Sequence, residues 1–272
     1  MYLGRYVGPP FVWQWTRVPG DVGCSGPESV VVVDTRHFFV GPSDFFVYDG
    51  TVPRSIGAPV REWFFANLNA TYRDRIVAVA DLPRDLLYFY YPSVASSGAL
   101  DSVLVYNFRT DRWGKQALAV DAVLQYSSGQ ITYDGLGALY SEYDDLPDIA
   151  YDSTFWLADS TIPGVFVGTS LYSVNGAPGA SWFKTGDFGD MVGYSHLSRV
   201  TPRYRTTPAA GTATNFYRAT LGEAATQDAT NPLSRSRFDF RRDARWHSVR
   251  IDHTAAAVVN GLDVALQGTS AE

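Results

Sequence analysis

The chain is poor in cysteine and lysine. Among its 272 residues it has one cysteine, Cys24, and two lysines, Lys115 and Lys184. A single cysteine excludes intrachain disulfides and clusters of cysteine ligands, so we expect packing alone to stabilise the fold. The chain also lacks a run of about 18 apolar residues that could span a membrane, and its first residues show no signal-peptide pattern. These absences favour a soluble protein assembled in a reducing cytoplasm.

Basic residues are outnumbered by acidic ones. The chain has 22 Lys and Arg against 28 Asp and Glu, a formal net charge of −6. Proteins that hold nucleic acid by its phosphates carry a basic face, so a dedicated DNA or RNA binder is disfavoured. Hydrophobic residues make up 46% of the chain and aromatic residues 15%, which is enough for a sizeable core.

Sequence motifs of the common enzyme classes are absent. The chain has no Gly-x-Ser-x-Gly elbow, P-loop, Gly-x-Gly-x-x-Gly fingerprint or Ser-x-Asp-x-Gly-x-x-Trp box, and its acidic groups do not match a calcium-binding EF-hand loop. Four histidines are dispersed along the chain: His37, His196, His247 and His253. We therefore expect no enzymatic activity, no cofactor, and no catalytic, cofactor-binding or metal-binding residue.

Short β-branched or aromatic segments, bounded by Gly, Pro or Asp, indicate strands in the first part of the chain. They cover residues 30–34, 37–40, 45–48, 86–91 and 102–106. Asp49-Gly50 and Thr110-Asp111 supply turn chemistry between such segments, so successive antiparallel hairpins are predicted. One helix is predicted over residues 59–68, because apolar side chains recur there at helical spacing and Pro59 suits a first turn.

The later part of the chain alternates more strictly between polar and apolar residues. After an acidic tract at 141–163, which we interpret as a surface loop, strands are predicted over 164–168, 170–174, 199–204, 215–221, 237–241, 246–252 and 262–267. Asn175-Gly176 and Asn260-Gly261 are predicted hairpin turns. We place one domain at residues 1–195 and a second, a β-sandwich or closing blade, at residues 196–272.

Two segments, 30–50 and 76–113, have the pattern of one repeated unit with several short strands and an aromatic residue near the outer strand. This pattern is typical of β-propeller blades, although the kelch double glycine and the WD dipeptide are absent. Tyr48, Tyr106 and Trp113 are the predicted blade-packing residues. The predicted fold is all-β: a divergent β-propeller-like meander with one short helix and a C-terminal antiparallel β-sheet or sandwich region.

Four blocks within residues 30–115, namely Phe45–Gly50, Val60–Asn69, Tyr88–Ser93 and Val105–Trp113, resemble the propeller of tail hub or nozzle proteins from tailed bacteriophages. The resemblance implies a structural virion protein of the tail or neck, assembled in the host cytoplasm. It implies a homo-oligomeric ring of about six subunits that contacts the portal, its adaptor and other tail proteins, lets double-stranded DNA pass during ejection, and involves no membrane. The family has no fixed catalytic motif, so no functional residue is carried over.

A conduit must not hold DNA, so acidic side chains are candidates for its wall or for subunit interfaces. These candidates are Glu142, Asp144, Asp145, Asp148, Asp152, Asp187 and Asp190.

A basic run spans residues 235–250. On a strand, Arg237, Asp239 and Arg241 would share one face and Phe238 and Phe240 the other, so Arg–Asp pairing beside a buried aromatic face is expected. A sharper hypothesis places Arg237, Arg241, Arg245 and Trp182 at an interface with the acidic tract of a neighbouring subunit.

Tryptophans are further interface candidates, although core packing is favoured for each one individually. They are Trp13, Trp15, Trp63, Trp182 and Trp246.

Two other functions fit a propeller. A carbohydrate-binding or glycan-processing propeller would use aromatic residues and carboxylates in a central pocket. A kelch-like protein-interaction propeller would bind peptides through its loops. Both would be monomeric, which separates them from a phage ring.

Overall fold

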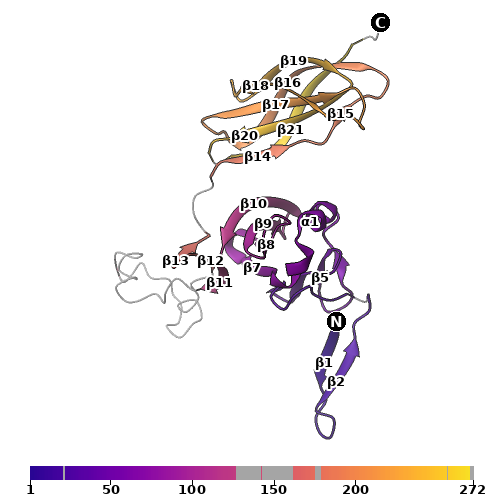
Figure 1. Ribbon diagram of the computed structural model, residues 1–272, viewed down its shortest axis with the longest axis vertical. Coiled ribbons are helices and arrows are strands. Elements are labelled where there is room, and N and C mark those ends of the chain that lie inside the picture. Colours follow the sequence, from indigo (N-terminus) through magenta and orange to yellow (C-terminus); the bar gives the residue numbers. More distant parts are fainter. Residues whose placement is uncertain (21, 127–141, 143–161, 175–178, 256, 270–272) are drawn as a thin grey trace. The chain divides into compact units, whose positions relative to one another are not determined.

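The computed structural model describes residues 1–20, 22–126, 142, 162–174, 179–255 and 257–269 (Figure 1). The fold is all-β, with several antiparallel sheets, and its described helices are short. The chain divides into two compact units, residues 1–175 and 176–272. Among the described residues, no helix is long and apolar enough to cross a membrane.

The first unit begins with a hairpin and continues with three sheets. The hairpin pairs β1 (Tyr2–Tyr6) with β2 (Trp13–Arg17). The second sheet runs β3 (Val30–Val33), β4 (Arg36–Val40), β5 (Phe45–Tyr48) and β6 (Arg54–Ser55). The third runs β7 (Val77–Asp81), β8 (Leu86–Tyr91), β9 (Leu100–Asn107) and β10 (Arg112–Val120). The last contains β11 (Ala122–Tyr126), β12 (Ile162–Val167) and β13 (Ser170–Ser173). Within each sheet every strand pairs with its neighbour in sequence, so the expected antiparallel hairpins are confirmed.

Short polar residues form the turns of these hairpins. Asp34, between β3 and β4, and Asp111, between β9 and β10, both have φ of 54°, a left-handed conformation that aspartate tolerates. The Asn107 side-chain oxygen accepts hydrogen bonds from the main-chain N–H groups of Arg109 (3.1 Å) and Thr110 (2.9 Å). The turn predicted at Thr110-Asp111 therefore joins β9 to β10.

Strand β8 is covered on both faces. Leu87, Phe89 and Tyr91 join a core shared with the β3–β6 sheet, whereas Tyr88 and Tyr90 join a core shared with Val165 of β12. Successive side chains of a strand point to opposite faces, so a strand that is apolar throughout needs a layer on each side. The β3–β6, β7–β10 and β11–β13 sheets are accordingly packed face to face, with the β7–β10 sheet in the middle.

Phe45 is central to the larger of these cores. Its ring centroid lies 4.7 Å from that of Phe64, 5.2 Å from Phe89 and 4.8 Å from Trp113. Phe64 is the buried residue of α1 (Arg61–Asn67), which confirms the predicted helix. The helix is shorter than the predicted 59–68 because Pro59 and Val60 lie in the turn before it and the backbone of Leu68 is extended. The 3-10 segments Ala70–Arg75 and Leu82–Arg84 flank β7.

The second unit is a sandwich of two antiparallel sheets. One has the order β14 (Ser181–Lys184), β20 (Trp246–His253), β17 (Gly211–Arg218) and β18 (Thr226–Pro232), and β15 (Phe188–Gly189) also pairs with β20. The other has the order β19 (Phe238–Ala244), β16 (Tyr194–Thr206) and β21 (Val258–Thr269). Between the sheets, Leu197, Val200, Phe238, Val249 and Ile251 are buried.

Two features of the second unit differ from the sequence-based expectation. The unit begins at residue 176, not 196, because β14 and β15 pair with β20. Asn260-Gly261 is not a hairpin turn: it lies inside β21, with Gly261 opposite Arg203 at a point where the pairing register shifts. An irregularity in the pairing of two strands uses the same residue types as a turn, which is why the prediction was wrong here. Asn175-Gly176 lies outside the described residues.

Candidate functional site

The three residues predicted to pack between blades lie in two different cores, one on each face of the β3–β6 sheet. The rings of Tyr106 and Trp113 lie 4.5 Å apart in the core between the β3–β6 and β7–β10 sheets. The indole N–H of Trp113 donates to the carbonyl oxygen of Ile56 at 3.2 Å, which ties β10 to the neighbouring sheet. Tyr48 instead packs on the opposite face of the β3–β6 sheet, with Val18. Two of the three residues thus link two sheets.

The Tyr106 hydroxyl is hydrogen-bonded to the turn that joins β9 to β10. It donates to Asp111 Oδ1 at 2.5 Å. Burial, followed by this hydrogen bond, raises the pKa of Tyr106. The phenol therefore stays neutral, which suits a packing role.

Most of the predicted acidic candidates cannot be placed. Asp144, Asp145, Asp148 and Asp152 lie outside the described residues, and Glu142 is exposed.

The two acidic candidates of the second unit have partners within it. Asp187 accepts two hydrogen bonds from Arg218, at 2.6 and 2.5 Å. Asp190 accepts one from the main-chain N–H of Val192 at 3.0 Å. Asp187 therefore presents a neutralised pair, not a free negative charge, and does not suit a repulsive wall. Among the residues that the structure describes, no three His, Cys, Asp or Glu side chains come together in a way that could hold a metal ion.

The basic run around β19 is engaged within its own unit. Phe238 and Phe240 are buried while Asp239 and Arg241 are exposed, and the Arg237 guanidinium lies 3.2 Å from Asp239. Arg–Asp pairing beside a buried aromatic face is thereby confirmed. The sharper hypothesis, an interface that uses Arg237, loses support because this guanidinium already has a carboxylate partner.

The other two members of that hypothesis have aromatic or cationic neighbours. The Arg245 guanidinium lies 5.3 Å from the ring centre of Tyr194. Trp182, 49% exposed, carries the guanidinium of Arg250 at 4.5 Å over its ring. Both contacts are cation–π pairs, and the cation over Trp182 occupies a face that a ligand would need.

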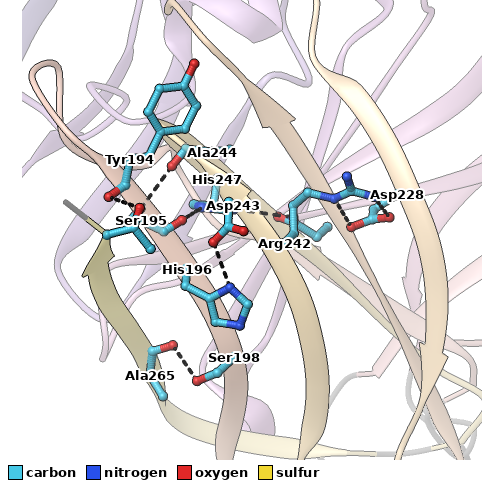
Figure 2. A network of polar contacts seen from close by, with 12 residues as sticks. Tyr194, Ser195, His196, Ser198, Asp228, Arg242, Asp243, Ala244, His247 and Ala265 are labelled. Carbon is cyan, nitrogen blue, oxygen red and sulfur yellow. Dashed lines mark hydrogen bonds and ion pairs between the residues drawn. The ribbon is translucent and has the colours of Figure 1, made fainter. Parts of the chain in front are cut away.

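A connected set of polar contacts joins β16, β19 and β20 (Figure 2). The Nε2 atom of the buried His247 lies 3.1 Å from the main-chain oxygen of Ser195, and its Nδ1 lies 3.3 Å from Asn215 Nδ2. The Ser195 hydroxyl donates to the main-chain oxygen of Ala244 at 3.2 Å. Serine and histidine therefore meet through backbone atoms, not as a nucleophile and its base. Burial lowers the pKa of His247, which keeps the ring neutral.

The edge of the same network carries ion pairs. His196 Nδ1 lies 2.7 Å from Asp243, and Arg242 forms a two-pronged pair with Asp228 at 2.9 and 2.8 Å (Figure 2). The guanidinium of Arg242 lowers the pKa of Asp228. These contacts cross between neighbouring strands and between the two sheets, so the network links the layers of the sandwich.

The N-terminal hairpin (residues 2–17) is different, because its aromatic side chains are uncovered. Tyr6 is 63% exposed, Trp13 55%, Trp15 66% and Phe11, near the tip, 76%. Figure 1 shows the hairpin extending away from the β3–β6 sheet. Core packing is therefore wrong for Trp13 and Trp15. It is also wrong for Trp63 and Trp182, which are exposed, whereas Trp246 is half-buried.

The exposed rings of the hairpin form an ordered row on one face. Tyr6 is paired with Trp13, and Gly4 with Trp15. The ring of Trp13 lies 5.8 Å from that of Tyr6 and 6.3 Å from that of Trp15. A Cβ added to Gly4 would lie 2.7 Å from the Trp15 ring, so this ring rests directly on the glycine backbone. We call Tyr6, Trp13 and Trp15 the aromatic row.

An apolar hollow of about 290 Å³ lies at the base of the hairpin. Its lining includes Tyr2, Leu3, Val18, Cys24, Phe39 and Tyr48. Small-molecule pockets usually measure about 300–1,000 Å³, so the hollow is suited to a ring or two and not to a large cofactor.

No protein family matches this chain, and no curated protein is significantly similar to it. The candidate site is therefore defined by geometry alone. It consists of the aromatic row, the hairpin tip (residues 7–12, between the paired strands) and the apolar hollow. The sequence placed Trp13 and Trp15 among the interface candidates, but it contained no signal for the hollow, whose lining residues are spread from Met1 to Tyr48.

Proposed function

We propose that this chain is a structural subunit of a tailed-bacteriophage tail hub or nozzle, and that it assembles into a ring through which DNA passes during ejection. The role is mechanical and not catalytic. The proposal extends to contacts with the portal, its adaptor and other tail proteins within the virion.

The observation that carries the proposal is the succession of stacked meanders in the first unit. The β3–β6 and β7–β10 sheets are consecutive four-stranded antiparallel meanders, packed face to face, and β3 contacts β7. This is how blades follow one another in a propeller, and the segment involved, residues 30–115, is the one that resembles the phage proteins. A divergent propeller is part of the proposal.

Exposed aromatic side chains supply a second argument. Soluble monomers seldom expose contiguous apolar patches without a function, and the aromatic row is such a patch. Tryptophan and tyrosine are enriched at protein interfaces. A subunit whose function is to assemble accounts for both facts.

Charge supports the passage of DNA. With a net charge of −6, the chain does not provide the dense array of phosphate contacts on which DNA affinity depends. We expect duplex DNA to bind no more tightly than an ordinary non-specific complex, with Kd of about 10⁻⁴ M or weaker at physiological salt. Tight, saturable binding in a fluorescence titration would contradict a sliding conduit.

The deciding experiment is the mass of the purified protein by light scattering, followed by negative-stain electron microscopy. A closed ring with a central hole supports the proposal. A monomer at every concentration that binds immobilised glycans would favour the carbohydrate-binding propeller, and a monomer that binds peptides would favour the kelch-like adaptor. Either result would overturn the proposed function.

A further inference from the structure

We infer that the N-terminal hairpin of one subunit docks on a second copy of this chain, with its tip in the apolar hollow at the base of that copy's hairpin. This inference rests on the proposed ring and names the contact that would build it. Four features of the hairpin and the hollow support it.

The aromatic row is prepared for binding. The ring of Trp13 lies beside those of Tyr6 and Trp15, and the Trp15 ring lies against Gly4. Rings that are already ordered lose little conformational freedom on docking, which leaves more of the contact energy for affinity. Tryptophan and tyrosine are also the residue types that dominate binding energy at interfaces.

The exposed area is of the right order for an interface. Four rings, those of Tyr6, Phe11, Trp13 and Trp15, are between about half and three-quarters exposed. A buried aromatic side chain removes 150–250 Å² from water, so covering these four exposed portions would bury roughly 400–650 Å². A standard interface buries about 800 Å² on each partner. The hairpin therefore supplies at least half of one side of a stable contact.

The hairpin cannot fill the hollow of its own subunit. Tyr2 and Leu3, at its base, line that hollow. The strands remain paired from Tyr2 with Arg17 to Tyr6 with Trp13, a span of roughly 13 Å at 3.3 Å per residue. Phe11 lies beyond that span, so it reaches its own hollow only if the β1–β2 pairing is broken. A second molecule does not have this restriction.

Charge favours a copy of the same chain as the partner. Residues 1–20 include two of the 22 basic residues, Arg5 and Arg17, and none of the 28 acidic ones. The rest of the first unit, residues 21–175, has 9 basic and 19 acidic residues, a net charge of −10, so a hairpin with a net charge of +2 approaches an acidic body. Opposite charges promote encounter and orient the partners.

The geometry has a consequence for the assembly. Tip and hollow are different surfaces, so the contact between them is heterologous. Contacts of this kind either close into a ring or continue as a filament. Hairpin docking therefore provides the type of interface that the proposed ring needs.

The first test compares charge introduced on the two faces of one strand. Trp15→Glu places a carboxylate in the aromatic row, and Gln14→Glu places the same charge on the opposite face of the hairpin, where Gln14 is paired with Arg5 and neither residue lines the hollow. We expect Trp15→Glu to raise the concentration at which rings form at least tenfold, and Gln14→Glu to change it less than twofold. Concentration-dependent light scattering on the full chain gives both values. Equal effects would overturn the inference.

The second test locates the contact and does not require a closed ring. Cys24 is exposed, lines the hollow and is the only cysteine. A Val12→Cys, Cys24→Ser double variant carries its sole thiol near the tip. Mixed with the unmodified protein and a short bifunctional maleimide, it should give a covalent heterodimer several times faster than a matched Val192→Cys, Cys24→Ser variant. Val192 is 82% exposed and lies in the second unit.

The two tests separate the failure of this inference from failure of the proposed function. If rings form equally well with Trp15→Glu and no cross-link between the tip and Cys24 appears, hairpin docking is overturned but the proposed ring is not. Cross-linking without closed rings would support hairpin docking and count against the conduit. Absence of both rings and cross-links would overturn both proposals.

Discussion

The cores of the two units of this protein differ in the types of side chain that they contain. In the first unit the principal core consists of aromatic rings in contact, with Phe45 touching Phe64, Phe89 and Trp113. In the second unit, most of the buried apolar side chains are aliphatic, and buried polar side chains lie beside them. His247, Asn215 and Ser248 are each at most 2% exposed.

This difference has a physical consequence. Aromatic packing depends on apolar area and shape, which do not change with pH. A buried histidine must remain neutral or carry an unfavourable charge, so a core that contains one responds to pH. The first unit should therefore be sensitive to the loss of ring volume, and the second to protonation.

The largest expected effect comes from emptying the aromatic core. Phe45→Ala should destabilise the first unit by about 3–5 kcal/mol, because it removes a fully buried ring and leaves a cavity. Phe45→Leu, which keeps most of the volume, should cost much less. Urea unfolding read by pulsed hydrogen–deuterium labelling reports the two units separately. A loss shared equally by both units would remove the contrast between them.

The second effect is a pH dependence of the sandwich that arises from its buried histidines. Burial lowers the pKa of His247 and of His253 below the ordinary value of 6.5. The unfolded imidazoles take up protons near pH 6.5 that the folded ones resist. Stability should therefore fall as the pH drops below about 6.5, by up to about 1.4 kcal/mol per pH unit for each histidine.

The same unfolding measurement, equilibrated between pH 7 and 5.5 and labelled at one common pH, checks this slope. Asp243 and His196 are the titratable groups that act on His247, and Asn215 contacts its ring. His247→Gln should reduce the slope in the second unit. An unchanged slope in that variant would show that His247 is not its source.

A smaller effect is expected from the ion pair at the edge of the sandwich. Arg242→Met should destabilise the second unit by about 1 kcal/mol, because Asp228, whose side chain is 15% exposed, loses a charged partner. Arg241→Met is the matched control: Arg241 is the preceding residue on the exposed face, and its loss should cost less than about 0.5 kcal/mol. Comparable losses for both variants would mean that the pair adds nothing.

The smallest effect on stability should come from the hairpin, although its effect on assembly should be clear. Gly4→Ala places a methyl group against the Trp15 ring, which is exposed and free to move away. Neither unit should change by more than about 0.5 kcal/mol, whereas ring formation should require more protein. Gly114→Ala, where a Cβ meets nothing within 4 Å, should alter neither. Unchanged assembly in Gly4→Ala would show that the order of the aromatic row is unimportant.

Several features of the fold were predictable because their causes are local. The helix at Arg61–Asn67 follows from apolar spacing, and the turn between β9 and β10 follows from Thr110-Asp111. The apolar run of β8 indicated a strand, and its two covered faces follow from side-chain alternation. Arg–Asp pairing beside Phe238 and Phe240 was predictable for the same reason.

Other features depended on contacts between distant residues. The start of the second unit was misplaced because β14 and β15 are short, and they are recognisable as part of the sandwich only through their pairing with β20. Asn260-Gly261 was misread because a turn and a ladder irregularity use the same residues. The pairing of Asp187 with Arg218 joins positions 31 residues apart, and the sequence around either residue does not predict it.

The sequence by itself determined that this protein is built from short antiparallel strands, that it has a single cysteine and no P-loop motif, and that it is rich in aromatic residues. The alternation of polar and apolar residues and the preferences of turn residues act over a few positions, so the sequence alone can reveal them. Only the tertiary structure decided which aromatic side chains are covered. A tryptophan is buried or exposed according to whether another layer reaches it, and that depends on the packing of remote segments: Trp113 is covered by the β3–β6 sheet, while Trp13 and Trp15 stand uncovered on the hairpin.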